Sequence, residues 1–100
     1  MAERLRRYVT VVARQPAVRA RARAELVERF QYVFACAPES LEELTRTVKF
    51  DVIVFVGPEA QAVRTSVEPV LSASPVAGRR VLVIDDPSFV PALVERALAP

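Results

Sequence analysis

Four short apolar runs recur along the chain at regular spacing, and each is followed by a stretch with helical periodicity. Most of the runs are β-branched and too continuously apolar for half-exposed strands, which is typical of strands inside a parallel sheet. Strands that alternate with crossovers of this length run parallel, with right-handed connections. The sequence therefore predicts an α/β three-layer sandwich with a four-stranded parallel sheet. The predicted strands are Tyr8 to Ala13, Tyr32 to Ala35, Val52 to Val56 and Val81 to Ile84.

The composition of the runs also predicts the order of the strands. Val52 to Val56 is the most apolar run and Tyr8 to Ala13 is rich in β-branched residues, so we expect these two strands side by side inside the sheet. Tyr32 to Ala35 is short and is expected at an edge. The predicted order is 2-1-3-4. Residues 1–100 are expected to form one domain, either complete or the N-terminal part of a longer chain.

Amphipathic stretches between the runs predict the helices. The first begins at Pro16, which suits a first-turn position, and the second opens at the capping box Ser40-Leu41-Glu42-Glu43. The third begins at Pro58 and should kink or break near Ser66 to Glu68, because Pro69 lies inside it. Ser72 to Gly78 has the composition of a loop.

The fourth helix is expected to follow a cap at Asp86-Pro87. Only the first helix is expected on one face of the sheet, with the later helices on the other. The helical residues predicted to face the core, in chain order, are Val18, Ala22, Leu26, Phe30, Leu41, Leu44, Val48, Ala62, Val63, Val67, Val70, Leu71, Phe89, Val90, Leu93, Val94 and Ala97.

The composition excludes several kinds of site. The chain has no histidine, which removes the commonest general base and the commonest metal ligand. Two glycines exclude glycine-rich phosphate loops, and a single Cys36 excludes an intramolecular disulfide and a cysteine zinc cluster. The apolar run near the start is interrupted by Arg14 and is too short for a signal peptide or a membrane span. We therefore expect a cytoplasmic chain that binds no cofactor, metal or membrane.

The charge is small overall but unevenly distributed. The net charge is +2, yet residues 1–30 hold eight arginines against three glutamates, which makes the first helix the basic end. Such a helix suits nucleic acid, but two glutamates share it and no aromatic residues interleave for stacking. A protein partner contacting Arg19 and Arg23 is therefore preferred, with nucleic-acid binding as a less favoured alternative.

The transitions from strand to helix follow a common pattern along the chain. The first strand runs into Arg14-Gln15-Pro16, and Tyr32 to Ala37 runs into Ser40 to Leu44. Asp51 precedes Val52 to Val56, and Val81 to Asp86 leads into the helix from Phe89 to Ala99. In this order the segments resemble a response-regulator receiver domain of the flavodoxin-like class over nearly the whole chain.

Receivers place two magnesium-binding acids after the first strand, an acceptor aspartate at the end of the third and a hydroxyl residue at the end of the fourth. Here Ala13 and Arg14 stand at the positions of the two acids, and Val56 stands at that of the acceptor. Asp85 stands about where the hydroxyl residue would be, and the chain ends before a fifth strand with its lysine. Magnesium needs carboxylate oxygens and a phosphoryl group needs a nucleophile. The resemblance therefore implies a shortened receiver without a phosphorylation site.

The leading hypothesis for function is a non-catalytic interaction module in a signalling or regulatory system, including transcriptional and two-component systems. The first alternative is a small flavodoxin-like or phosphocarrier-like enzyme that uses Cys36 or Asp85-Asp86. Against it, Cys36 has no sequence-adjacent cation to lower its pKa, and acids before Pro87 more often cap a helix. The second alternative is a nucleic-acid accessory protein that binds through the arginine-rich helix.

Two structural expectations follow from the resemblance. We expect Arg14 to lean toward Asp85 or Asp86 and to occupy the space where a metal would lie. Because a single helix cannot cover four strands, we also expect apolar sheet surface beside the first helix to stay open at Val81 and Val83. This surface predicts a homodimer, or docking to a downstream domain in a longer chain.

Overall fold

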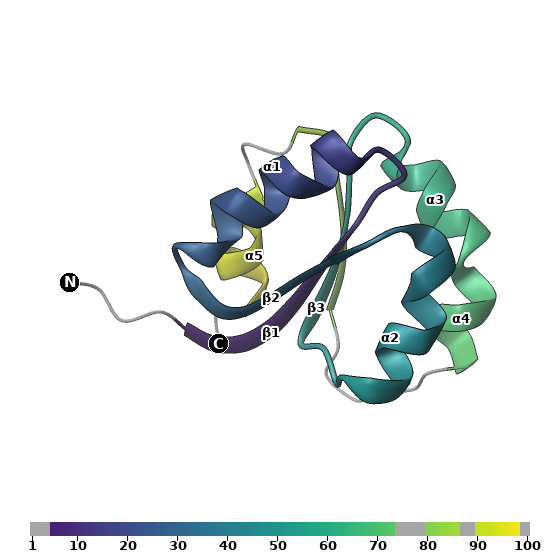
Figure 1. The fold of residues 1–100 in the computed structure, drawn as a ribbon, viewed down its shortest axis with the longest axis horizontal. Helices are drawn as coiled ribbons and strands as arrows, with labels where there is room; N and C mark the ends of the chain where they lie inside the picture. Colours follow the sequence, from purple (N-terminus) through teal and green to yellow (C-terminus); the bar gives the residue numbers. More distant parts are fainter. Residues whose placement is uncertain (1–4, 74–79, 87–89, 99–100) are drawn as a thin grey trace.

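The computed structural model describes residues 5–73, 80–86 and 90–98. In these ranges strands and helices alternate, and the helices flank one sheet on both sides (Figure 1). The strands are β1 (Leu5–Val12), β2 (Phe30–Cys36), β3 (Val52–Val56) and β4 (Arg80–Ile84). The helices are α1 (Pro16–Val27), α2 (Leu41–Thr47), α3 (Ala60–Ser66), α4 (Glu68–Ala73) and α5 (Val90–Leu98), and the 3-10 turn η1 (Pro38–Ser40) precedes α2.

The described strands form one parallel sheet in the order β2-β1-β3-β4. Val9 of β1 lies between Val33 of β2 and Val52 of β3, and Val56 of β3 lies beside Ile84 of β4. All five residues of β3 are buried, as expected for a continuously apolar strand covered on both faces. The predicted three-layer α/β/α sandwich with strand order 2-1-3-4 is confirmed, and this is the arrangement of flavodoxin-like folds.

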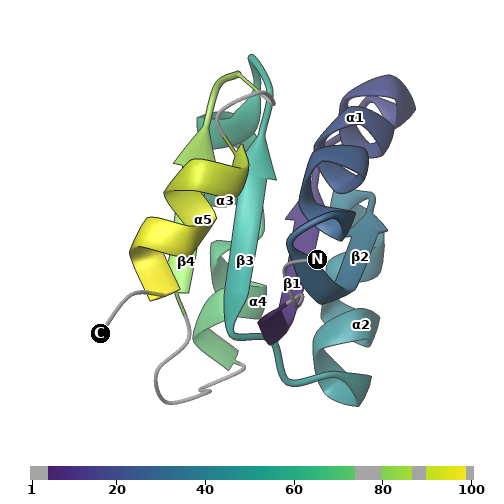
Figure 2. The ribbon, with the colours of Figure 1, turned by 90° about the vertical axis from the view of Figure 1, so that its left-hand side faces the viewer.

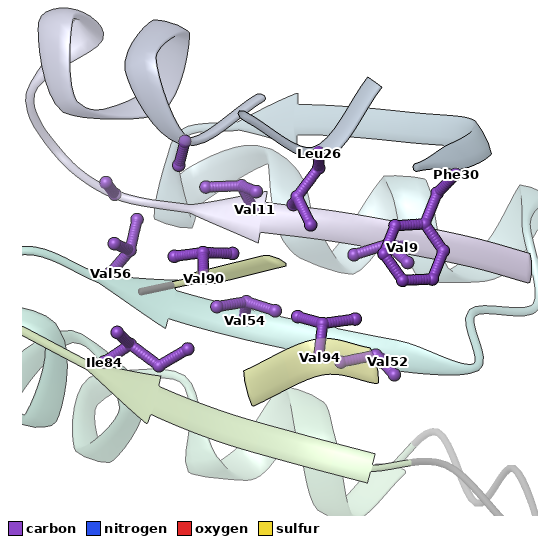
Figure 3. Close-up of a cluster of buried hydrophobic side chains, with 12 residues drawn as sticks. Val9, Val11, Leu26, Phe30, Val52, Val54, Val56, Ile84, Val90 and Val94 are labelled. Atoms are coloured by element: carbon purple, nitrogen blue, oxygen red, sulfur yellow. The ribbon is translucent and has the colours of Figure 1, made fainter. Parts of the chain in front are cut away.

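The helices form two layers that cover opposite faces of the sheet (Figure 1 and Figure 2). The layer of α1 and α5 packs on one apolar cluster, shown in Figure 3, which consists of Val9, Val11, Ala13, Ala22, Leu26, Phe30, Val52, Val54, Val56, Ile84, Val90 and Val94. The other cluster lies under α2, α3 and α4, and consists of Val12, Cys36, Leu41, Phe50, Ile53, Phe55, Ala60, Val63, Val67 and Leu71.

The prediction that the first helix lies alone on its face is wrong. Helix α5 joins α1 on that face and buries Val90 and Val94 completely against the sheet. The physical reason is burial: α3 and α4 occupy the opposite face, while Val54 and Ile84 would be exposed on the α1 side without a second helix. The expected open apolar surface is therefore covered, and the predicted homodimer loses its structural argument.

The expected orientation of the β4 side chains is also wrong. Val81 packs on the cluster under α3 and α4, whereas Leu82 packs on the cluster under α1 and α5. Val83 lies on the same face as Val81, because side chains alternate along a strand, and it is 37% exposed. Both valines therefore point away from the α1 side on which they were expected.

Local details of the helices differ from the sequence pattern at several points. Ser40 makes no capping bond through its side chain, because η1 has already placed it in a helical conformation. The break near Ser66 to Glu68 is confirmed: α3 ends at Ser66, and Pro69 takes a first-turn position of α4. The third helix begins at Ala60 and not at Pro58, and α4 extends to Ala73, into the expected loop. Ala62 and Leu93, which were predicted to face the core, are exposed. The rest of that loop, the Asp86-Pro87 cap and Phe89 involve residues outside the described ranges.

Candidate functional site

The carboxyl ends of β1 and β3 meet at one edge of the sheet, which is where ligands of open α/β sheets bind. Ala13 and Val56 are each only 3% exposed there. A small pocket of about 10 Å³ at this edge is lined by both residues and by neighbours that include Arg14, Val18 and Gly57. This end of the sheet therefore presents buried apolar side chains at Ala13 and Val56, which have no carboxylate to bind a metal or accept a phosphoryl group.

The turn after β3 reaches close to α1. Gly57 has φ of 104° and its N–H donates to the Ile84 carbonyl oxygen at 2.9 Å, which ties the turn to the end of β4. A Cβ atom at this position would lie 3.2 Å from a methyl group of Val18. Glycine is therefore required both by the backbone conformation and by the close approach of the helix.

Arg19 is held by the backbone at the end of β1. Its guanidinium donates to the Ala13 carbonyl oxygen at 2.7 Å and to the Arg14 carbonyl oxygen at 3.1 Å. A fixed cation thus satisfies two backbone carbonyl groups directly after β1. Arg19, predicted as a partner contact, therefore has a structural role at this position.

The predicted pairing of Arg14 with the aspartates is not formed within the described ranges, although Arg14 does line the small pocket at this edge. Arg14 and Asp85 are both exposed, and no ion pair joins Arg14 to Asp85 or Asp86 among the described residues. A pair reaching across two strands at the surface gains at most about 1 kcal/mol, and it must offset the lost freedom of a long side chain. Arg14 therefore stays in solvent.

Cys36 ends β2 and is buried, with 8% of its surface exposed. Its Sγ lies 3.9 Å from the Thr10 hydroxyl oxygen on the neighbouring strand. Burial raises the pKa of the thiol, and the Thr10 contact and the charge of Arg19 offset this effect only in part. The thiol is therefore protonated at neutral pH, which favours a packing role over a nucleophilic one.

A groove lies between the C-terminal half of β2 and helix α2. Its volume is about 540 Å³, large enough for several side chains of a bound segment. Phe34 and Leu44 give it an apolar floor, and Glu43 adds a carboxylate. The complete lining is Arg19, Phe34, Ala35, Cys36, Ala37, Ser40, Glu43, Leu44 and Thr47.

Sequence reasoning identified Cys36 and Arg19 separately but missed this groove. One signal was present: Ser40, Glu43, Leu44 and Thr47 recur at helical spacing and so share one face of α2. The structure also stacks the rings of Tyr8 and Tyr32, with centroids 4.4 Å apart on neighbouring strands. That contact depends on strand register, which the sequence pattern did not specify.

Within the described ranges, no three His, Cys, Asp or Glu side chains gather closely enough to form a metal site. No helix among the described residues is long and apolar enough to cross a membrane. Comparison of this chain with protein-family models, with curated proteins and with solved structures finds no match.

Proposed function

We propose that this chain is a receiver-like interaction domain that acts in the cytoplasm without phosphoryl transfer, in signalling or gene regulation. One observation carries the proposal: Ala13 and Val56 are buried apolar residues at the positions that the resemblance assigns to the metal-binding and acceptor acids of a receiver. The pocket that both residues line has a volume of about 10 Å³. Arg19 adds a fixed positive charge at the same edge. The chain thus combines a receiver-like strand order with apolar residues at the strand ends where a receiver carries its reactive groups.

The alternative enzyme hypothesis rests on Cys36 and on the Asp85-Asp86 pair. Cys36 is buried with a raised pKa, so its reactive thiolate is scarce at neutral pH. Asp85 is exposed at the end of β4, and Arg14 forms no ion pair with it. Among the described residues, neither the Cys36 thiol nor the Asp85 carboxylate forms an ion pair that would activate it as a nucleophile or base.

Intact mass spectrometry after incubation with acetyl phosphate and magnesium tests the proposal. We expect no phosphorylated species, whereas a receiver with a complete acidic site serves as the positive control. A stable phosphoryl adduct contradicts the proposal. If that adduct disappears after the thiol is blocked, Cys36 is the acceptor and the enzyme hypothesis replaces the interaction domain.

A further inference from the structure

Strand β2 forms one edge of the sheet and presents backbone groups that β1 does not use. The Cys36 carbonyl oxygen accepts from the Ala13 N–H at 3.4 Å, so the backbone of Cys36 faces β1. Because N–H and C=O groups alternate in direction along a strand, the backbone groups of Val33 and Ala35 face away from β1. Ala35 is exposed, and its N–H and C=O are therefore accessible to a further strand.

The sequence of this edge lacks the usual protection against added strands. Natural edge strands carry charged residues, internal prolines or bulges that discourage pairing. From Phe30 to Ala37 the chain has no charged residue and no proline. The outward-facing backbone groups of this seven-residue strand, including those of Val33 and Ala35, thus lie along an uncharged edge.

The two sides of the edge differ in chemistry. On the α2 side, the groove defined above offers Phe34 and Leu44 to an apolar side chain, with Glu43 beside them. On the α1 side, Arg23 lies one helical turn after Arg19, which itself reaches the end of β1 and lines the groove near β2. Arg23 is exposed and takes part in none of the ion pairs between described residues.

We propose that the β2 edge binds an extended segment of a partner protein in which acidic and apolar residues alternate. The backbone of the segment pairs with Val33 and Ala35, its apolar side chains enter the groove against α2, and its acidic side chains face Arg23. Backbone pairing gives affinity and alternate side chains give specificity in this mode of recognition. On the opposite side, the carboxylate of Glu43 disfavours acids beside α2, while Arg19, which also lines the groove, is engaged with the Ala13 and Arg14 carbonyl oxygens. This inference rests on the proposed interaction function and names its surface and partner chemistry.

Fluorescence anisotropy with a short labelled peptide, in which glutamate alternates with valine, tests the inference. One control peptide has lysine in place of glutamate, and another has the same composition with glutamates and valines in separate blocks. We expect the alternating acidic peptide to bind at least about tenfold more tightly than either control, as charge-assisted contacts and correct side-chain alternation require.

Two variants with matched controls locate the site. A35P removes an outward N–H from the β2 edge, and V83P does the same at the β4 edge, where Arg80 and Ile84 use their own backbone groups toward β3. R23E reverses charge on the β2 side of α1, and R21E does so on its other side. We expect A35P and R23E each to lower the affinity for the acidic peptide by at least about tenfold. The control variants V83P and R21E should change that affinity by less than about twofold.

Three results would overturn the inference. The acidic and lysine peptides could bind with equal affinity, the affinity for the acidic peptide could be unchanged by both A35P and R23E, or V83P could lower that affinity as much as A35P does. Sedimentation provides the remaining test, because a dimer that A35P dissociates would assign the edge to a second copy of the chain. Circular dichroism establishes whether A35P folds, and R23E decides the matter if it does not. The phosphorylation assay is independent of this edge, so failure of the peptide to bind is distinguishable from failure of the proposed function.

Discussion

The two edge strands of the sheet are built differently. β2 has seven residues without a charge, whereas β4 has five residues with Arg80 at its start and Asp85 directly after its end. The Arg80 Nε donates to the Ala97 carbonyl oxygen at 3.2 Å, which joins the start of β4 to helix α5. A charged residue within the strand and its bond to α5 thus protect β4. β2 carries no charge within its length, although Arg29, directly before it, pairs with Glu95 of α5.

This difference indicates which edge is adapted to contact. Edge protection is a common property of monomeric β structures, and its absence on one side is informative only because the other side has it. The sequence-based argument, that one helix without a fifth helix beside it cannot cover four strands, pointed to β4. The structure instead leaves β2 as the edge strand without a charged residue within its length.

The largest expected effect concerns the helix that covers the β2 half of the sheet. Leu26 of α1 is fully buried, and L26A should lower the free energy of unfolding by about 2–5 kcal/mol because a cavity remains. V94A in α5 provides the comparison over the β4 half, and its loss should be smaller because valine is one methylene shorter than leucine. Urea unfolding followed by circular dichroism measures both. A larger loss for V94A would mean that the β4 half depends more on its helix.

A smaller effect is expected at Gly57, in the turn that follows β3 and is hydrogen-bonded to the end of β4. G57A places a Cβ at 3.2 Å from Val18 on a backbone with φ of 104°, so it should destabilise the fold by about 1–3 kcal/mol. The double variant G57A/V18A relieves the close contact but not the backbone strain. Recovery of full stability in the double variant would show that contact alone requires the glycine.

Proline at the two edges should have a still smaller effect on stability. A35P and V83P each remove an N–H that faces away from the sheet, and each should cost less than about 1 kcal/mol. A35D at the β2 edge and V83D at the β4 edge, both at exposed positions, extend the comparison in sedimentation experiments. If the chain is a dimer that V83D dissociates while A35D does not, β4 is the contact edge and the comparison is reversed.

The sequence predicted the sheet well because its strands differ strongly in hydrophobicity. The continuous apolar run of β3 identified a central strand, and Pro69 correctly marked the break between α3 and α4. The side on which α5 packs was not predictable from its own pattern, since its apolar residues fit either face of the sheet. That choice depends on which face α3 and α4 leave uncovered.

The candidate site was less predictable than the fold for a related reason. The residue types of Ala13 and Val56 predict apolar side chains at the strand ends, and both are buried in the structure. The exposed long side chain of Arg14 was not placed correctly, since little energy favours one conformation over another at the surface. The groove combines residues of β2 and α2, and its shape depends on packing that no local pattern records.

The smallest expected effect concerns Cys36 at the end of β2. Burial raises the thiol pKa in the folded state above its ordinary value of 9.0, so the folded protein retains its proton at pH values where the unfolded chain has lost it. The contribution of the Cys36 thiol to the free energy of unfolding is therefore fully present below pH 9. It decreases as the pH rises through the folded-state pKa. The free energy of unfolding of the wild type should fall relative to that of C36A across this range, after both are normalised at neutral pH. Parallel curves for the two proteins would show that the thiol is solvated at the end of β2, and that the groove beside it opens further than the structure indicates.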